Sequence, residues 1–210
     1  WDGGGADNDW ETALNWSGDT VPTDTDDVVI DTEVNVLLNG STTINSLTIG
    51  SSTVPATSTL TFNYSATTSG ALVIDDGNLT IESLGVITHA TGSTNSSITG
   101  NIEIDVQTGD FTINAGGSID VNETGYDAVS DGLNGNGPGA GISGSASNSG
   151  GGGAYGGNGG DASDGQSGGS AYGSTTNPIS LGSSGGGAGN ISQFSGAGGG
   201  LVVLNVTGTT

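Results

Sequence analysis

The stretch from Ile102 to Val121, which reads IEIDVQTGDFTINAGGSIDV, decides the fold class. In its first five residues apolar and acidic side chains alternate strictly, and a similar alternation returns at Phe111–Ile113 and at the end of the stretch. A period of two is typical of a β-strand with one buried face. The connections, Thr108–Asp110 and Ala115–Gly117, consist of small residues that form tight turns. The stretch therefore predicts three short strands with tight corners.

Similar apolar runs recur upstream, at Leu47–Ile49, Leu60–Phe62 and Leu79–Ile81. No stretch shows the apolar spacing of an amphipathic helix, so we expect an all-β protein. Short strands that recur every ~7–15 residues fit a β-solenoid or a β-sandwich. The similar, tight corners favour the parallel β-helix (β-solenoid), in which apolar side chains stack from coil to coil. A β-sandwich is the alternative.

Composition divides the chain into four parts. Residues 1–33 contain 10 of the 22 acidic residues and all three tryptophans, and we interpret them as an acidic, tryptophan-rich N-terminal cap. We expect residues 34–131 to form the β-solenoid coils. Residues 132–200 form a glycine-rich segment that we expect to pack on the solenoid, and residues 201–210 a closing strand.

The glycine-rich segment has a bias of three residues. Between Gly132 and Ser174, one register of every third residue holds 10 glycines in 15 positions. Polyproline II geometry repeats every three residues, so this bias indicates short polyglycine-II-like segments whose backbones approach closely. A disordered glycine/serine tail or irregular ordered loops are the alternatives. Tyr155, Tyr172 and Phe194 argue against a free tail, which would have little use for them.

The charge balance excludes several classes of function. The chain has no lysine, no arginine and a formal net charge of −22, which argues against binding to nucleic-acid phosphates or to anionic membranes. It also has no cysteine, so disulfides, thiol nucleophiles and zinc–thiolate sites are impossible. No apolar run approaches the ~18 residues of a membrane span. The chain opens at Trp1, which suggests a processed or excised segment.

Repulsion among the carboxylates could be relieved by spreading, by salt or by a bridging cation. Asp24, Asp26 and Asp27 supply oxygen ligands of the kind that Ca²⁺ accepts, and we take them as the candidate metal site, with calcium as the candidate cofactor. No EF-hand loop accompanies them. The alternative is a solvated anionic surface whose carboxylates accept hydrogen bonds from local backbone amides.

The aromatic residues and the single histidine each have two interpretations. Trp1, Trp10 and Trp16 could form a platform for sugars, but we favour a cover over the open end of the β-core. His89 has no second histidine with which to bind zinc, and no G-x-S-x-G motif accompanies it. We therefore expect His89 at the surface or in a turn.

Paired carboxylates can catalyse glycoside hydrolysis, and the nearest pairs are Asp75 with Asp76 and Glu103 with Asp105. Glu103 and Asp105 alternate with apolar residues, so both should point outward. Nothing else in the sequence supports catalysis, and we predict no catalytic residues and no enzymatic activity.

Threonines occupy the centre of four similar apolar runs. Stacked coils would place these threonines on one face, and such arrays can bind ice, although ordinary strand propensity explains them as well. The residues are Thr48, Thr61, Thr80 and Thr112.

The sequence resembles a known class of secreted proteins. The opening WDGGGADNDWETALNWSGDTVP, followed by DDVVID and INSLTIG, is similar to the start of secreted bacterial autotransporter-type and adhesin-like proteins. GGGGAYGGNGG and GAGGGLVVLNVTG are similar to glycine-rich β-helix segments of the same class. The resemblance implies a parallel β-helix outside the cell. Typical members carry some lysine and arginine, and this chain has none.

Together these patterns predict an extracellular, cell-surface protein with a structural or adhesive role. We expect a subunit of a surface fibre or a module of a large adhesin, because the open ends of a solenoid favour end-to-end stacking or strand donation. Its partners would be copies of itself or neighbouring repeats, and surface glycans are a further candidate. A carbohydrate-binding module, a polysaccharide-active enzyme and an ice-binding protein are the alternatives.

Overall fold

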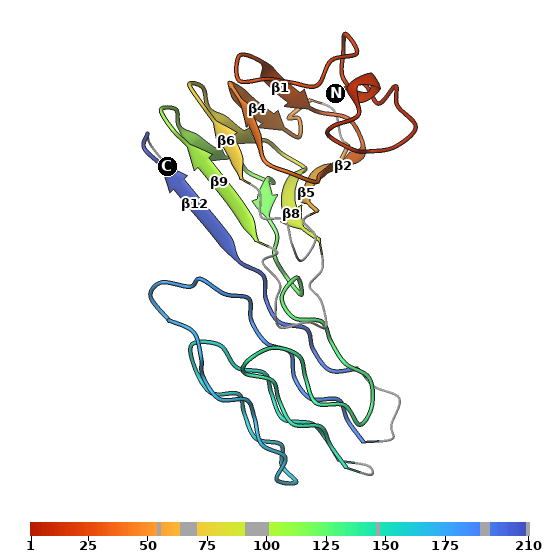
Figure 1. Cartoon of the computed structure of the whole chain (residues 1–210), viewed down its shortest axis with the longest axis vertical. Coiled ribbons are helices and arrows are strands. Elements are labelled where there is room, and N and C mark those ends of the chain that lie inside the picture. The colour runs from red at the N-terminus through yellow and green to blue at the C-terminus, as the bar shows by residue number, and fades with distance from the viewer. Residues whose placement is uncertain (54–55, 64–70, 91–100, 146–147, 190–193, 209–210) are drawn as a thin grey trace. The chain divides into compact units, whose positions relative to one another are not determined.

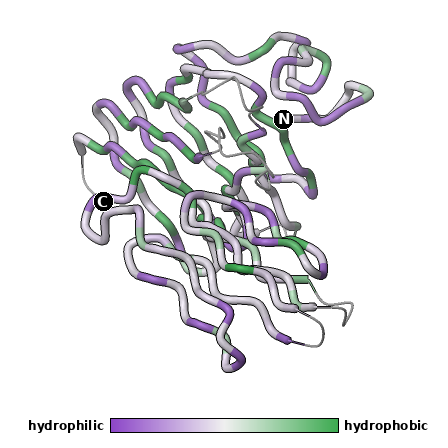
Figure 2. The backbone as a smooth tube through the Cα atoms, turned by 60° about the horizontal axis from the view of Figure 1, so that its bottom comes forward, coloured by the Kyte–Doolittle hydropathy of each residue, from purple (hydrophilic) through white to green (hydrophobic). Residues whose placement is uncertain are grey.

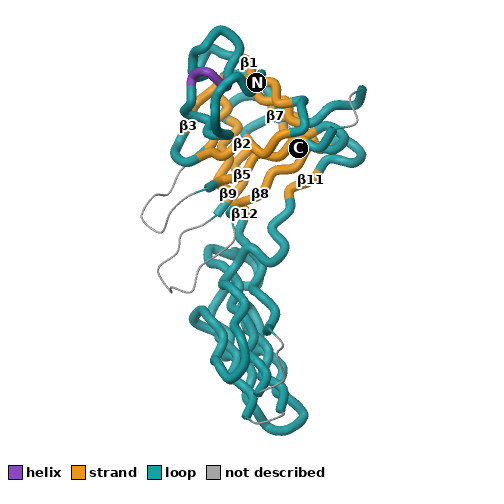
Figure 3. Tube along the Cα trace, turned by 90° about the vertical axis from the view of Figure 1, so that its right-hand side faces the viewer, coloured by secondary structure: helices purple, strands orange, loops and turns teal. Residues whose placement is uncertain are grey.

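The computed structural model describes residues 1–53, 56–63, 71–90, 101–145, 148–189 and 194–208. These residues form two compact units, one made of residues 1–90, 102–120 and 202–210, and the other of residues 91–101 and 121–201. The described strands all belong to the first unit, as Figure 3 shows. The elements are η1 (Ala13–Asn15), β1 (Asp27–Ile30), β2 (Val34–Leu38), β3 (Thr42–Ile44), β4 (Ser46–Ile49), β5 (Ser58–Phe62), β6 (Leu72–Ile74), β7 (Leu79–Ile81), β8 (Gly85–His89), β9 (Ile102–Val106), β10 (Phe111–Ile113), β11 (Ser118–Ile119) and β12 (Val202–Val206).

The strands wind into a parallel β-solenoid (Figure 1). Every third strand returns to the same sheet, which gives three four-stranded sheets with the orders β1-β4-β7-β10, β2-β5-β8-β11 and β3-β6-β9-β12. All the pairings between these strands are parallel. Each group of three successive strands is therefore one coil, and the expected all-β parallel solenoid is confirmed.

Apolar side chains form columns inside the solenoid. Leu47 and Leu79 are in register, as are Ile49 and Ile81, and all four side chains are fully buried. Along β4 and β7 these inward positions alternate with more exposed ones. Figure 2 shows hydrophobic and more hydrophilic residues alternating along the backbone of this unit. Removal of apolar surface from water is the main favourable contribution to folding, so these columns are the core that stabilises the coils.

The larger part of the second unit, residues 121–201, is an insertion in the last coil. In each coil the second and third strands are joined at the same corner, by residues 39–41, 63–71, 90–101 and 120–201 in successive coils. The fourth connection contains nearly all of the glycine-rich sequence. The solenoid begins at Asp27, inside the residues 1–33 assigned to the cap, and the inserted unit begins at Val121, ahead of residue 132. The closing strand, β12, completes the fourth coil.

The glycine-rich unit is a bundle of extended segments rather than a sheet. Gly151 donates its N–H to the carbonyl of Ile142 and accepts a bond from Gly186, whereas the adjacent Gly152 bonds to Gly160 and Gly169. One segment thus bonds to four others, while a strand in a sheet has only two neighbours. A chain with three residues per turn points successive peptide groups in different directions, as this pattern requires.

Close approach of backbones explains the three-residue register. At eight of its ten glycines an added Cβ would lie under 3.0 Å from another atom. At Gly150, for example, the added Cβ would meet the carbonyl group of Gly186. Any larger residue at such a position would push two segments apart.

Candidate functional site

The N-terminal residues cover the first coil. Trp10 donates its backbone N–H to the carbonyl of Leu37 at 2.9 Å, and Leu37 donates to the carbonyl of Asn8 at 2.8 Å. These bonds add a short parallel bridge between Asp9 and Leu37 to the free edge of β2. The backbone groups at this end of the solenoid are therefore partly paired within the chain.

The three tryptophans pack against one another in this cap. The rings of Trp1 and Trp16 and those of Trp10 and Trp16 meet edge to face, with centroids 4.9 and 4.7 Å apart. The indole Nε1 of Trp16 donates to the carbonyl of Trp10 at 2.7 Å. Trp10 is 0% exposed and Trp16 only 4%. Their position fits the interpretation as a cover and leaves neither ring free to act as an open platform.

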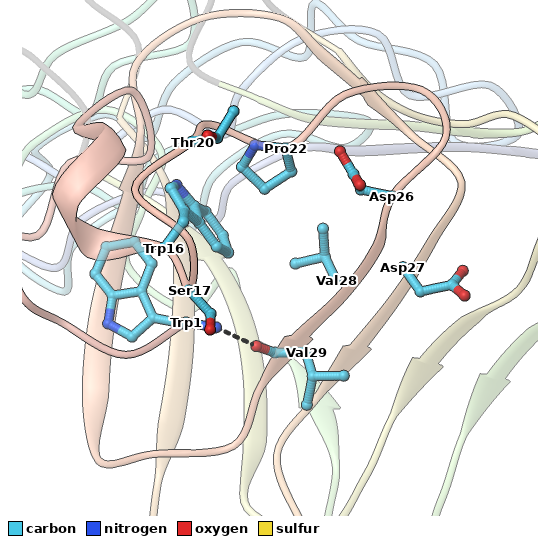
Figure 4. Close-up of a pocket in the computed structure, with 9 residues that line it drawn as sticks. All are labelled: Trp1, Trp16, Ser17, Thr20, Pro22, Asp26, Asp27, Val28 and Val29. Atoms are coloured by element: carbon cyan, nitrogen blue, oxygen red, sulfur yellow. Dashed lines mark hydrogen bonds between the residues drawn. The ribbon is translucent and has the colours of Figure 1, made fainter.

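A pocket lies beside this cluster and includes the edge of Trp16 (Figure 4). Its apolar wall is formed by Trp1, Trp16, Pro22, Val28 and Val29. The amino group of Trp1 donates to the carbonyl of Val29 at 2.9 Å, which fixes the first residue to β1. The polar groups that line the pocket belong to Ser17, Thr20, Asp26 and Asp27.

The carboxylates chosen as calcium ligands have separate local partners. Asp26 accepts bonds from the backbone N–H and the hydroxyl of Thr23, both at 2.8 Å, and these bonds hold the pKa of Asp26 below its ordinary value. Bonds from Ser46 and Asn45, at 2.6 and 2.7 Å, likewise lower the pKa of Asp27.

Within the part of the chain that the structure describes, no group of three potential ligands gathers into a metal site. Asp24 is exposed and makes no hydrogen bond to a described residue through its side chain. The calcium site at Asp24, Asp26 and Asp27 stays a prediction.

The opposite end of the solenoid is uncovered. β10, β11 and β12 are each the last strand of their sheet among the described residues. In the third coil the inward residues are fully buried, but their partners in the fourth coil are partly exposed, and Ile113 reaches 43%. The partly exposed inward residues are Phe111, Ile113, Ile119, Val202, Leu204 and Val206.

His89 lies in the core, not at the surface or in a turn. It ends β8 in register with Phe62 and Leu38, and it is 2% exposed. Its Nδ1 lies 2.9 Å from the carbonyl oxygen of Ala90, so the proton of the neutral ring belongs on Nδ1. Burial lowers the pKa of His89. A buried neutral ring in an apolar column has a packing role.

The two carboxylate pairs lie on the outside of the solenoid. Glu103 and Asp105 point outward from β9, as the alternation predicts, between buried apolar residues. Asp75 and Asp76 are exposed after β6, where the hydroxyl of Thr108 donates to the Asp76 carboxylate at 3.0 Å. Neither pair lines the pocket beside the cap.

Three of the four threonines share a face. Thr48, Thr80 and Thr112 are in register on the outer side of the first sheet. Thr61 lies instead on β5, in the second sheet, where its hydroxyl donates to Asn35 at 2.6 Å. The array is one column of three threonines, with Val29 in register at its end.

No family model, curated protein or solved structure matches the chain. Among the residues that the structure describes, no helix has the length and apolarity to cross a membrane. The assignment of a function therefore depends on the geometry of the two ends of the solenoid.

Proposed function

We propose that this protein is an extracellular structural or adhesive β-solenoid of the cell surface, either a subunit of a fibre or a module of a large adhesin. It has no enzymatic role. It joins a further β-coil, from another copy or from a neighbouring repeat, through the uncovered end formed by β10, β11 and β12. The resemblance of its opening and its glycine-rich stretches to secreted adhesin-like proteins supports the location.

The uncovered fourth coil is the observation that carries the proposal. An edge strand presents unpaired N–H and C=O groups, and three such edges end the solenoid together. Ile113 and Leu204 continue the buried columns that end in Ile81 and Ile104. Another coil with inward apolar residues would bury these side chains and pair the edges at the same time.

The difference between the two ends gives the association a direction. At the first coil, Ile30 and Val36 are fully buried, and the cap bonds to β2. A partner cannot reach that end without displacing residues 1–26. The fourth coil is therefore the end that we expect to bind, and association of purified chains would join two fourth coils first.

Light scattering on the purified chain tests the proposal. We expect dimers whose fraction rises with protein concentration, and we expect Ile113→Asp to reduce them to monomers, because the variant places a charge on the inward side of the last coil. Thr112→Asp is the matched control, since its side chain points outward from the same strand. A wild-type chain that stays monomeric at millimolar concentration would contradict the proposal.

A further inference from the structure

The pocket beside the cap combines an apolar wall with unused polar acceptors. Trp1, Trp16 and Pro22 face the same hollow as Val28, and Asp26 lies at its rim (Figure 4). The hollow has a volume of about 230 Å³ and is partly open to solvent. Because the tryptophans are fixed by edge-to-face packing and by the Trp16–Trp10 hydrogen bond, the wall is held in place before a ligand arrives.

The charges around the pocket limit its ligand. The whole chain lacks lysine and arginine, so no side-chain cation can pair with an anionic ligand. Asp26 and Asp27 are both exposed carboxylates, which carry negative charge at neutral pH. A phosphate or a carboxylate ligand would be repelled.

The carboxylate oxygens beside the pocket are hydrogen-bond acceptors, so they favour a ligand that carries hydrogen-bond donors. The two bonds to Asp26 both use Oδ2, and the two bonds to Asp27 both use Oδ1. Among the described residues nothing donates to the other oxygen of either carboxylate. In Figure 4 the Asp27 carboxylate points away from the hollow, whereas the Asp26 carboxylate points into it. A hydroxyl group of a sugar can therefore donate to Asp26 Oδ1, while the apolar face of the ring lies against Trp1 or Pro22.

We propose that this pocket binds one residue of a neutral oligosaccharide. A hydroxyl of the sugar donates to Asp26 Oδ1, and the apolar face of the sugar lies against Trp1 and Pro22. This proposal names a ligand for the adhesive part of the proposed function. It stands apart from the association of the fourth coil, because the two sites share no residue.

Saturation-transfer NMR and calorimetry on the whole chain test the site, with maltotriose, cellotriose, mannotriose and tri-N-acetylchitotriose as probes. We expect at least one probe to bind, with a change in tryptophan fluorescence. Asp26→Asn should weaken binding about tenfold or more, since a hydrogen bond to a charged group is lost. Asp27→Asn should not, because the Asp27 carboxylate points away from the hollow (Figure 4). Asp24→Asn is the matched control, because Asp24 does not line the pocket.

Three outcomes would overturn the proposal. These are the absence of binding by all four probes at millimolar concentration, binding that survives the Asp26→Asn substitution, and preferential binding of tetramethylammonium, which would indicate a cation pocket. Circular dichroism shows whether each variant is folded. Loss of sugar binding with unchanged light scattering contradicts only this site, whereas monomers that still bind sugar contradict only the proposed association.

Discussion

At the scale of single residues, His89 shows how a polar side chain fits an apolar column. It takes the inward position that Phe62 and Leu38 occupy in the previous coils. The neutral ring satisfies its Nδ1 proton at the carbonyl of Ala90, so burial does not leave that donor unpaired. A charged ring at this position would lose its hydration, and this is why burial lowers the pKa of His89.

The first prediction is a loss of stability in mild acid that depends on His89. Above its ordinary pKa of 6.5 the ring is neutral in both the folded and the unfolded chain. As the pH falls below that value, the unfolded chain takes up a proton that the folded chain does not, so the free energy of unfolding decreases. Urea unfolding at several pH values should show this decrease in the free energy of unfolding for the wild type and not for His89→Leu.

The comparison with His89→Leu separates the histidine from the carboxylates, because both chains contain the same carboxylates. Hydrogen bonds lower the pKa values of Asp7, Asp26 and Asp27, whereas burial raises the pKa values of Glu11 and Asp127. Parallel pH profiles of the wild type and His89→Leu between about pH 7 and pH 5 would contradict a buried neutral histidine.

The second prediction concerns two glycines of the inserted bundle. Gly150→Ala should destabilise the bundle by about 1–3 kcal/mol, because the new methyl group overlaps the carbonyl group of Gly186. Gly160→Ala is the matched control, since an added Cβ there meets nothing within 4 Å. The control should be neutral or gain about 0.4–1 kcal/mol from reduced freedom of the unfolded chain. Equal effects in thermal unfolding would be evidence against close packing of the segments.

At the scale of elements, the cap depends on Trp10. Its ring is fully buried over the first coil, and replacement by alanine should cost about 3–5 kcal/mol. The Nε1 of Trp10 has no hydrogen-bond partner among the described residues, so Trp10→Phe should cost less, since it removes an unpaired donor. Chemical denaturation of both variants checks the order. A similar loss of stability in Trp10→Phe and Trp10→Ala would contradict the burial of the Trp10 ring over the first coil.

The strands were largely predictable from the sequence. Alternation with a period of two identifies the runs at 47–49, 60–62, 79–81, 102–106 and 111–113, because burial of one face requires it. The run at 119–121 is shorter than predicted, because the chain leaves the coil for the inserted unit at Val121. Thr61 was placed on the wrong sheet, since alternation gives the face within a strand and not which sheet the strand joins.

The site was less predictable than the strands. The tryptophans indicated a cover for the end of the core, but the pocket needs residues 16–29 to fold back beside Trp1. The burial of His89 escaped prediction because a lone histidine at the end of a run has no sequence signal that separates an inward from an outward position. The insertion of the bundle within the fourth coil required the pairing of β12 with β9.

At the scale of the whole molecule, charge is unevenly distributed. Of the 22 acidic residues, the inserted unit contains only Glu123, Asp127, Asp131, Asp161 and Asp164. The other 17 lie in the solenoid unit and have no side-chain cation to offset them. Self-repulsion therefore opposes folding of the solenoid more than that of the bundle.

The resulting prediction is a strong dependence of thermal stability on salt. Raising NaCl from about 0.01 M to 0.15 M shortens the screening length from about 30 Å to 8 Å and should raise the melting temperature. Calcium bound by Asp24, Asp26 and Asp27 would add a further rise at equal ionic strength that a chelator reverses. If Mg²⁺ and Ca²⁺ act alike, screening alone explains the effect, and the calcium site is wrong.

Hydrogen exchange on the wild-type chain at low and high protein concentration tests the binding role of the fourth coil most directly. If that coil pairs with a further coil, amides of β10 and β12 should become protected as the concentration rises, while those of β4 and β5 stay unchanged. If the amides of β10 and β12 exchange equally fast at every protein concentration, the fourth coil does not pair with a further coil and the proposed binding role is wrong.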